Sequence, residues 1–434
     1  MNFAPANRED GCTAPRAGAS FGDDRIPALL VIAAGPLQLP AIECAAALGV
    51  RTVAVDGDFR APGMALADAG HVVDILDSVA VEQVARSERV SAVMTLCTDA
   101  PVRTVAAVAA ALGLPALSCA AAANATDKRL MRRALESASV PIPAFRQVEG
   151  VASALSAADV LGYPVALKVA CSSGSRGVFK VASSEELGVR FHQAREHQPD
   201  GALLLEEWLD GPEVSVEGIC YAGHVHVIQV TDKLLFPGPY PIEAGHTQPS
   251  RLPQETIARI RSVAEAGVRA LDLSSCAFHA ELKVTPDGPK IIEIGARLGG
   301  DRIATHLTPL STGVDLVQAA ILVALGQEPD LRPRWGRGAA VRYFRANGCG
   351  SVESIEGIDD LPSSPGLEFL YAASERNGPL APGFAIREVR SSLDRYGHVI
   401  FSGTDAAQAA ERAERAAASV RFRFHSPVLR SVGP

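Results

Sequence analysis

Strongly apolar runs alternate with amphipathic stretches in the first third of the chain. The apolar runs occupy residues 28–34, 51–56, 71–75 and 91–97, and helical spacing of apolar positions fills the gaps between them. This alternation predicts a parallel sheet with helices on both faces, which binds ligands at the carboxyl ends of its strands. The turn after the first strand has the sequence GPLQLP instead of GxGxxG. A nicotinamide or flavin site is therefore not expected there, and we interpret this region as a Rossmann-like half that shapes a substrate cleft.

The pattern changes near Asn124. A capped amphipathic helix that ends before Pro141 comes first, and strand-like runs then dominate. These runs cover residues 164–170, 179–182, 202–209, 213–231, 339–346, 368–373 and 397–404, and a helix rich in Ala, Glu and Arg follows at 405–418. We predict a disordered leader (1–24), an N-terminal α/β domain (25–123), an α+β domain (124–332) and a small C-terminal α+β subdomain (333–434).

Two carboxylates and an arginine stand in an apolar hairpin at residues 277–297. Glu281 lies in AFHAELKV and Glu293 in KIIEIG, a Pro-Asp-Gly turn separates the two runs, and Arg297 follows four residues later. On adjacent strands the two glutamates would repel each other unless a cation neutralised them. Ion pairs with Lys283 or Lys290, or simple exposure to solvent, are the alternative explanation.

Composition narrows the class of ligand. The chain has 434 residues, 47% of them hydrophobic, and a net charge of −8 without any run of Lys or Arg, so a general nucleic-acid binder is not expected. The eight cysteines contain no CxxC pair, which indicates neither a disulfide framework nor a thiolate metal site and fits a reducing cytoplasm. The most apolar stretch, residues 28–50, is interrupted by prolines and polar residues, so no membrane span is predicted. A small-molecule ligand is the expectation.

Two segments have features of a phosphate site. Lys168 ends an apolar strand, and a Ser/Gly-rich loop with Ser172, Ser173, Gly174, Ser175 and Gly177 follows it. Amides of such a loop could surround phosphates, although the segment is not a Walker A motif and a plain hairpin turn is an equal alternative. Lys128 lies on the helix after Asn124, where by itself it would be expected to be solvent-exposed.

The segment LLLEEWLDGPEVSV is typical of a nucleotide site. An apolar strand leads into Glu206, Glu207 and Leu209, and Glu213 opens the next strand after an Asp-Gly-Pro turn. A linking segment of this kind can offer backbone groups to an adenine edge, and a carboxylate just beyond it can hold ribose hydroxyls.

The order of these pieces resembles the ATP-grasp superfamily of carboxylate-amine ligases, over residues 26–331. Within the superfamily, the sequence is most similar to the L-amino acid ligases that make dipeptides. The resemblance implies an ATP-grasp fold with an N-terminal Rossmann-like domain, a small lid at about 140–205, a catalytic large subdomain and a C-terminal subdomain that completes it. By position, it implies the following roles: Lys128, Lys168 and residues 172–177 at the ATP phosphates; Glu206, Glu207 and Leu209 at adenine; Glu213 at the ribose; Glu281 and Glu293 on magnesium; and Arg297 on the acyl phosphate and the tetrahedral intermediate. Many members have Asn where this chain has Gly295, which leaves one metal ligand in doubt.

The implied reaction joins a carboxylate to an amine. ATP would phosphorylate an amino-acid carboxylate, and the amine of a second amino acid would displace phosphate, with Mg²⁺, or alternatively Mn²⁺, as the metal. The expected partners are small amino-acid substrates, with no nucleic acid or membrane, in a cytoplasmic protein for which a homodimer is the default. One alternative is an ATP-grasp carboxylase that activates bicarbonate, as biotin carboxylases do. A catalytically inactive nucleotide-binding protein is the other.

Residues 236–250, FPGPYPIEAGHTQPS, are rich in proline and glycine between a strand that ends near Thr231 and a helix that begins near Gln254. We predict an irregular loop here, which is either a surface connection or a functional segment. A similar EaGH segment occurs in the dipeptide ligases. The resemblance therefore assigns Glu243 to a substrate ammonium and His246 to a substrate carboxylate or the reaction intermediate.

Overall fold

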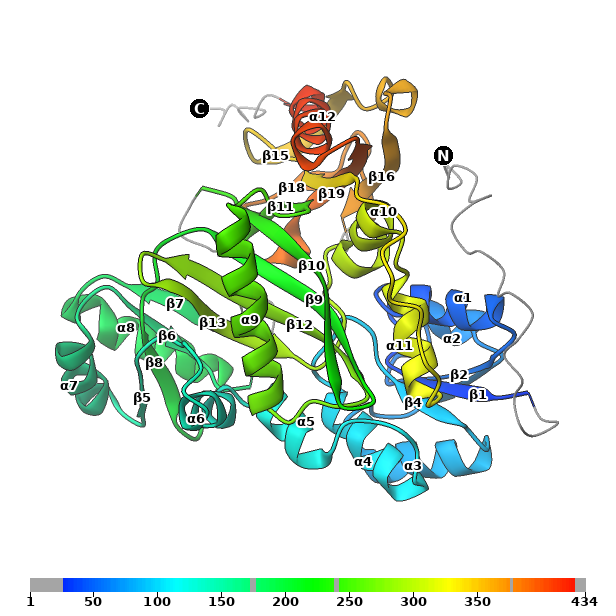
Figure 1. Cartoon of the computed structure of the whole chain (residues 1–434). Coiled ribbons are helices and arrows are strands. Elements are labelled where there is room, and N and C mark those ends of the chain that lie inside the picture. Colours follow the sequence, from blue (N-terminus) through cyan, green and yellow to red (C-terminus); the bar gives the residue numbers. More distant parts are fainter. Residues whose placement is uncertain (1–25, 172–176, 238–241, 375–377, 426–434) are drawn as a thin grey trace, which may run out of the picture. The chain divides into compact units, whose positions relative to one another are not determined.

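The computed structural model describes residues 26–171, 177–237, 242–374 and 378–425 (Figure 1). Contacts divide the described residues into a larger unit, within residues 26–231 and 252–335, and a smaller unit, within residues 232–251 and 336–425. The predicted leader, residues 1–24, lies outside the described residues. The predicted domain boundaries at 123/124 and 332/333 stay a prediction.

The larger unit begins with a four-stranded parallel sheet of order β3-β2-β1-β4. Its strands are β1 (Ala28–Ile32), β2 (Arg51–Asp56), β3 (Ala69–Val72) and β4 (Ala92–Met94), and its helices are α1 (Leu39–Ala47), α2 (Pro62–Leu66), α3 (Ser78–Ser87), α4 (Val102–Leu112) and α5 (Cys119–Thr126). Leu29 and Val31 pack into a core with α1, while Leu30 and Ile32 pack into another with α3 and α4. Both faces of β1 are thus buried, which confirms the predicted parallel sheet with helices on both sides.

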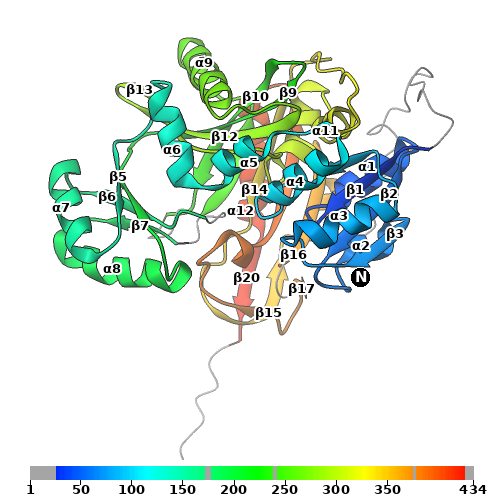
Figure 2. The same cartoon turned by 90° about the horizontal axis from the view of Figure 1, so that it is seen from below.

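A small antiparallel sheet of order β5-β8-β6-β7 follows helix α6 (Lys128–Ser137). The strands are β5 (Phe145–Val148), β6 (Val165–Lys168), β7 (Val178–Val181) and β8 (Leu203–Glu207), and the helices are α7 (Val151–Leu161) and α8 (Ser184–His197). Leucines and alanines of α7 and α8 share a core with the sheet, and Figure 2 shows both helices beside it. Lys168 is the last residue of β6, so its side chain is placed where the strand ends.

A third sheet of the larger unit has the order β13-β12-β9-β10. Its strands are β9 (Glu213–Tyr221), β10 (His224–Leu235), β12 (Cys276–Thr285) and β13 (Gly288–Gly295), with α9 (Gln254–Ala270) packed along it (Figure 1). The predicted hairpin is confirmed, because Thr285 pairs with Gly288 across a two-residue Pro-Asp turn. After it come a π-helical turn, η1 (Ile303–Leu307), and the helices α10 (Thr308–Thr312) and α11 (Leu316–Ala324).

The smaller unit contains the remaining strands. They are β11 (Glu243–Gln248), β14 (Gly338–Tyr343), β15 (Gly350–Glu356), β16 (Leu367–Ser374), β17 (Gly378–Pro379), β18 (Ala385–Ile386), β19 (Tyr396–Gly403) and β20 (Arg421–Phe424), with the short helices η2 (Leu361–Ser363) and η3 (Ser392–Asp394). The end of β10, from Asp232 onward, pairs with β11, and the order continues β14-β19-β16-β17. Helix α12 (Ala406–Ser419) packs its alanines against the β14 and β19 side chains.

The expectation of an irregular loop at 236–250 is wrong for its second half. Residues 243–248 form β11, which pairs with β10 on one side and with β14 on the other. The sequence EAGHTQ gives no apolar alternation, because its buried side chains are polar: His246, Thr247 and Gln248 are all almost fully buried. Backbone pairing with two neighbours therefore decides this strand, whereas sequence pattern does not.

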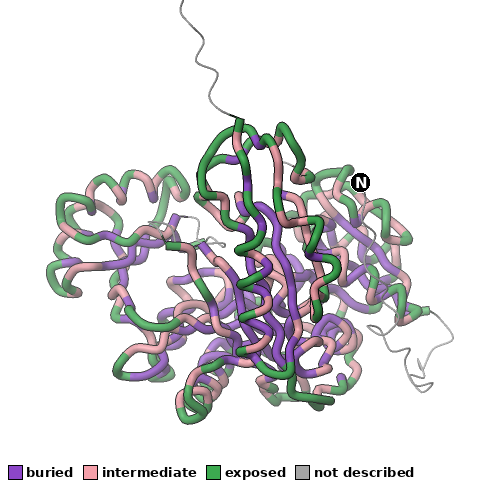
Figure 3. The backbone as a smooth tube through the Cα atoms, turned by 90° about the horizontal axis from the view of Figure 1, so that it is seen from above, coloured by how far each residue is buried: buried purple, intermediate pink, exposed green. Residues whose placement is uncertain are grey.

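Burial follows the strands of both units, as the buried segments of Figure 3 indicate. Among the described residues no single helix is long and apolar enough to cross a membrane. One bent pair, Ile303–Thr312 with Leu316–Ala324, meets the requirement by length and composition only.

Candidate active site

Glu281 and Glu293 face each other in the β12–β13 hairpin of the larger unit. They are register partners on adjacent strands, and their side chains are 26% and 29% exposed. The alternative of ion pairs with the hairpin lysines is not what the structure has: Lys283 lies 3.3 Å from Glu213, and Lys290 lies 3.0 Å from Glu207. The two glutamates thus form a half-buried pair of carboxylates on one face of the sheet.

Lys128 neutralises one of these carboxylates. Its Nζ lies 2.9 Å from Glu293 Oε1, and its side chain is only 6% exposed, so the expectation of a solvent-exposed lysine is wrong. Lys128 is the first residue of α6, where the Asp127 side chain caps the helix by accepting from Arg129 N–H. The backbone N–H of Lys128 donates to Ala170 O at 3.0 Å, just beyond β6. The start of α6 and the end of β6 therefore hold Lys128 over the β12–β13 hairpin.

His279 orients the second carboxylate. Its Nε2 lies 3.2 Å from Glu281 Oε1, and its Nδ1 lies 2.7 Å from Oε1 of the fully buried Glu217. Burial alone would lower the pKa of His279, but Glu217 and then Glu281 outweigh it and raise the pKa to about 9. Burial likewise opposes ionisation of Glu217, and His279 nevertheless holds the pKa of that carboxyl below its usual value. A charged imidazolium between two carboxylates fits both shifts.

Arg297 is held by a residue that the sequence did not single out. Its Nε and Nη2 each lie 2.9 Å from a different oxygen of Asp99, which follows β4. Gly295 lies against this ion pair, because a Cβ on it would be 3.0 Å from Asp99 Oδ1 and 3.3 Å from Arg297 Cζ. The ion pair would therefore have to shift to admit a side chain at this position, including the asparagine that many superfamily members have. Nearby, Cys97 donates to Gly299 O at 3.2 Å, and burial raises the pKa of this thiol to about 12.

Lys168 and Glu206 meet in a buried cluster with Arg132 of α6. Glu206 Oε2 lies 2.6 Å from Lys168 Nζ, and its Oε1 accepts from Arg132 Nε at 2.6 Å. Burial alone would raise the pKa of Glu206, but Arg132 and then Lys168 outweigh it and hold the pKa at about 2. Arg132 also donates from Nη2 to Ile292 O at 2.6 Å, next to Glu293. The cluster joins α6, the small sheet and the hairpin.

The predicted nucleotide segment begins at the end of β8, which contains Glu206 and Glu207, and continues to the start of β9. Glu207 is 37% exposed in its side chain and accepts from Lys290, while its backbone N–H donates to Ala144 O at 2.8 Å. Leu209 is buried, and Lys180 of β7 lies 4.5 Å above the ring of Trp208. Glu213 opens β9 beside Lys283. The adenine and ribose assignments for these residues stay predictions.

Most of the Ser/Gly loop lies outside the residues that the structure describes. Ser172, Ser173, Gly174 and Ser175 lie outside the described residues, so their predicted phosphate contacts are not tested. Gly177, at its end, adopts φ +68°, where a Cβ would approach Val169 Cγ2 to 2.8 Å. Its carbonyl accepts from Val169 N–H at 3.1 Å, so this position requires a glycine to close the loop beside β6.

Two facing carboxylates are suitable ligands for a hard cation. Mg²⁺ prefers oxygen ligands, is often held by only one or two carboxylates, and keeps several waters. Glu281 and Glu293 match this chemistry, and Gly295 adds no side-chain ligand. No group of three or more His, Cys, Asp or Glu arranged to hold a metal occurs in the part of the chain that the structure describes. The pair therefore fits a magnesium ion that brings substrate phosphates or water as its other ligands.

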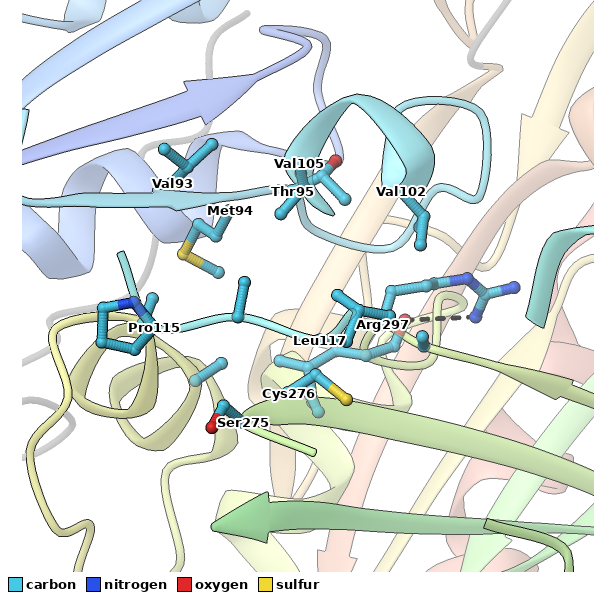
Figure 4. Close-up of a pocket in the computed structure, with 16 residues that line it drawn as sticks. Val93, Met94, Thr95, Val102, Val105, Pro115, Leu117, Ser275, Cys276 and Arg297 are labelled. Atoms are coloured by element: carbon cyan, nitrogen blue, oxygen red, sulfur yellow. Dashed lines mark hydrogen bonds between the residues drawn. The ribbon is translucent and has the colours of Figure 1, made fainter. Parts of the chain in front are cut away.

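A small cavity of about 50 Å³ lies behind Arg297. Figure 4 shows Val93, Met94 and Pro115 at its apolar end, while the Arg297 guanidinium points away from them. Small-molecule sites typically enclose about 300 to 1,000 Å³. This cavity is too small for a nucleotide.

Glu243 and His246 lie on β11 in the smaller unit. Glu243 Oε2 accepts from Ser392 Oγ at 2.7 Å, and Lys233 and Arg395 lie 3.9 Å and 3.8 Å from its two oxygens. The carboxylate is thus held among cations before any substrate binds. His246 is 1% exposed, and its carbonyl accepts from Arg342 Nη1 at 2.9 Å.

Sequence reasoning missed Asp99, Arg132, Glu217 and His279. Asp99 had a signal, since it follows the last strand of a parallel sheet, where ligands gather. His279 also had one, because it lies two residues before Glu281 on the same face of a strand. Arg132 and Glu217 had none, because a single arginine in an amphipathic helix and a single glutamate in a strand are ordinary surface patterns.

Comparison with known proteins matches two parts of the chain. Residues 161–305 match a family model described as an ATP-grasp domain, and residues 342–425 match one described as L-amino acid ligase C-terminal domain 2. The first range includes Lys168, Glu206, Glu281, Glu293 and Arg297.

Curated relatives and a solved structure agree with these matches. The chain is 27% identical over 244 residues to alanine–anticapsin ligase of Bacillus subtilis, covering 51% of each protein. It is 30% identical over 190 residues to carnosine synthase 1 of Gallus gallus, covering 41% of this chain and 20% of that protein. The crystal structure of an L-amino acid ligase from Bacillus licheniformis has a TM-score of 0.78 at 22% identity, over 93% of this chain and all of that one. The chain thus spans about half or less of these curated relatives, and the family resemblance drawn from the sequence is confirmed.

Proposed function

We propose, since this chain belongs to the ATP-grasp superfamily, that it is an ATP-dependent carboxylate-amine ligase. In this reaction an amino-acid carboxylate is activated as an acyl phosphate and joined to the amine of a second amino acid. The products are a dipeptide or related amide, ADP and phosphate. The observation that carries the proposal is the juxtaposition of Lys128, Glu281 and Glu293 with an Arg297 held by Asp99.

Positioning and charge neutralisation account for most of phosphoryl-transfer catalysis. Lys128 and Lys168 would hold the ATP phosphates, and each is already fixed by a carboxylate, Glu293 and Glu206 respectively. Glu281 and Glu293 would hold magnesium, which when bound offsets negative charge on the phosphates. When ATP binds, its phosphates would thus take over some of the ionic contacts that the two lysines make with carboxylates in the free protein.

Arg297 would act on the acyl group. Its guanidinium has two donors on Asp99 and one, Nη1, on Leu298 O at 3.2 Å. A side chain held in this way needs little reorganisation when negative charge develops on the carbonyl oxygen. The attacking α-amine has an ordinary pKa of about 7.7 to 8.0, so only modest help is needed to make it a neutral nucleophile.

Glu243 and His246 are the proposed substrate residues, with the ammonium assigned to Glu243 and a carboxylate or the intermediate to His246. The match of residues 342–425 to an L-amino acid ligase C-terminal domain supports an amino-acid substrate. Lys233 and Arg395 already surround Glu243, so a substrate ammonium would compete with them or join them. The cytoplasmic location and the homodimer stay predictions.

The test is a screen for ADP and phosphate release over pairs of amino acids, with mass spectrometry of the products. We expect ADP and phosphate in equal amounts, together with a dipeptide. Stoichiometric AMP and pyrophosphate would contradict acyl-phosphate chemistry. ADP release that needs bicarbonate and no amino acid would favour the carboxylase alternative. ATP binding without turnover under every pair would favour the inactive nucleotide-binding protein.

A further inference from the structure

Glu206 links the two elements that carry the predicted phosphate lysines. We propose that its carboxylate, braced by Arg132, positions Lys168 for the triphosphate of ATP and does not bind adenine. This inference rests on the proposed function, from which it takes the assignment of Lys168 to the phosphates.

The carboxylate of Glu206 is fully engaged where it lies. Each oxygen lies 2.6 Å from a different cation, Arg132 on one side and Lys168 on the other, and the residue is 1% exposed. An adenine amino group would need a carboxylate oxygen that reaches the binding surface. Neither oxygen does, so only the backbone of Glu206 remains for adenine, and that backbone pairs with β5 and β6.

The same cluster fixes the position of Lys168 relative to Lys128. Arg132 lies one turn after Lys128 on α6, so the two side chains share one face of the helix. Lys128 reaches Glu293, and Arg132 reaches Ile292 O, one residue away on β13. The Lys128 N–H also donates to Ala170 O, two residues after Lys168. Through Glu206, the spacing of the two lysines is set before any nucleotide binds.

A lysine needs such a partner more than most side chains do. Its ammonium stands on a flexible four-carbon stem, whose rotamers lose conformational entropy when the side chain is ordered. An acceptor that holds the ammonium in the free protein has already met that cost when the phosphates arrive. Because both cations depend on one buried carboxylate, removing its charge would leave Lys168 and Arg132 to repel each other and displace the lysine.

The experiment compares two probes that differ only in phosphate. The dissociation constant of ATP, with Mg²⁺ present, is measured by calorimetry, and that of adenosine by its displacement of ATP. The proteins are the full native chain, Glu206→Gln, Glu206→Asp and the matched control Arg133→Met. Arg133 also lies on α6, where its exposed side chain donates to Gln147 Oε1 at 3.1 Å. Circular dichroism and thermal unfolding of each variant report its fold.

We expect Glu206→Gln to weaken ATP binding about tenfold or more, the scale of a lost charge-assisted contact, and to change adenosine binding less than about twofold. Arg133→Met should match the native protein with both probes. Glu206→Asp keeps the charge but withdraws it by one methylene, so it should show the same selective loss to a smaller extent. If Glu206→Gln fails to fold, the comparison of ATP with adenosine is made with Glu206→Asp instead.

Three results would overturn the proposal. Equal weakening of ATP and adenosine would mean that the carboxylate contacts adenine. Unchanged binding of both probes in a less stable protein would mean that Glu206 serves the fold alone. Tighter binding of ATP by Glu206→Gln would mean that the charge of Glu206 only repels the phosphates. Failure of the proposed function gives a different result, in which the native protein binds ATP but releases no ADP with any pair of amino acids.

Discussion

Asp99 and Arg297 form a two-point ion pair, in which Nε and Nη2 of the arginine each lie 2.9 Å from a different carboxylate oxygen. Burial alone would raise the pKa of Asp99, but Arg297 outweighs it and holds the pKa of that carboxyl below its usual range. The two residues are 198 positions apart, and their pairing orients the arginine of the ExxxR sequence.

Replacing Asp99 should reduce turnover without removing the arginine. In Asp99→Asn the charge is lost and one acceptor oxygen remains, so Arg297 keeps a contact but loses its fixed orientation. We expect kcat to fall about tenfold to a hundredfold, and Arg297→Ala to cost about a hundredfold to a thousandfold. The KM for ATP should change little in Asp99→Asn. Steady-state measurement of ADP release gives kcat for both variants and the KM for ATP.

Asp330→Asn is the control for the Asp99→Asn and Arg297→Ala variants. It removes an ion pair with Arg332, whose side chain is 89% exposed. Exposed ion pairs contribute little to stability, so the kinetics of Asp330→Asn should match those of the native protein. Native kcat in Asp99→Asn would contradict an orienting role for Asp99.

Gly295 should not tolerate the asparagine that many superfamily members have. A Cβ there would lie 3.0 Å from Asp99 Oδ1 and 3.3 Å from Arg297 Cζ, so a longer side chain must displace the ion pair. We expect Gly295→Asn to lower kcat, instead of improving metal binding, and to lower the midpoint of thermal unfolding. Gly150→Asn is the matched control, because nothing lies within 4 Å of a Cβ at that helix N-cap. A Gly295→Asn protein with higher kcat at low magnesium would show that the ion pair can move aside.

Glu293→Gln should nearly abolish turnover in a folded protein. The change removes a predicted magnesium ligand and also the partner of Lys128 at 2.9 Å. Loss of one preorganised electrostatic contact costs on the order of 10² to 10³ in rate. The measurement is ADP release as a function of magnesium concentration, with Glu281→Gln beside it. Near-normal turnover of Glu293→Gln at the native magnesium requirement would contradict the metal assignment.

Glu243→Ala should raise the KM for one amino acid far more than that for ATP, and His246→Ala should lower kcat as well. Glu243 supplies the carboxylate proposed for the ammonium, and His246 is almost fully buried on the same strand. The KM for ATP serves as the internal control. If both variants keep native KM values for every amino acid, β11 has no part in substrate binding.

The buried Glu206 cluster should make stability depend on pH in one direction. The pKa of Glu206 falls from 4.5 to about 2 on folding, so its contribution is complete above about pH 5 and is lost as the pH falls toward 2. That shift corresponds to roughly 3 kcal/mol. The free energy of unfolding in urea, for native protein and Glu206→Gln, should therefore differ most near pH 7 and less as the solution is acidified. A difference that stays constant from pH 7 down to about pH 3 would contradict the lowered pKa.

The sequence by itself determined the elements that local pattern dictates. Alternating apolar runs predicted the parallel sheet of β1 to β4, since a strand buried on both faces needs apolar side chains throughout. The Pro-Asp-Gly turn predicted the β12–β13 hairpin, and a period of two placed Glu281 and Glu293 on one face of it. The order of the charged motifs, and not any single one, carried the resemblance to the ATP-grasp superfamily.

Only the tertiary structure decided which charges meet. Lys128 and Glu293 are 165 positions apart, Arg132 and Glu206 are 74 apart, and nothing in either local sequence specifies its partner. The strand at 243–248 likewise depends on pairing with two distant strands, because its polar side chains give no strand pattern. Local propensity acts over a few residues, whereas a buried charge is stable only beside an opposite charge that the fold brings to it. The ion partners of Arg132 and Glu206 were therefore beyond the reach of the sequence, whereas Asp99 had a partial signal in its place after β4.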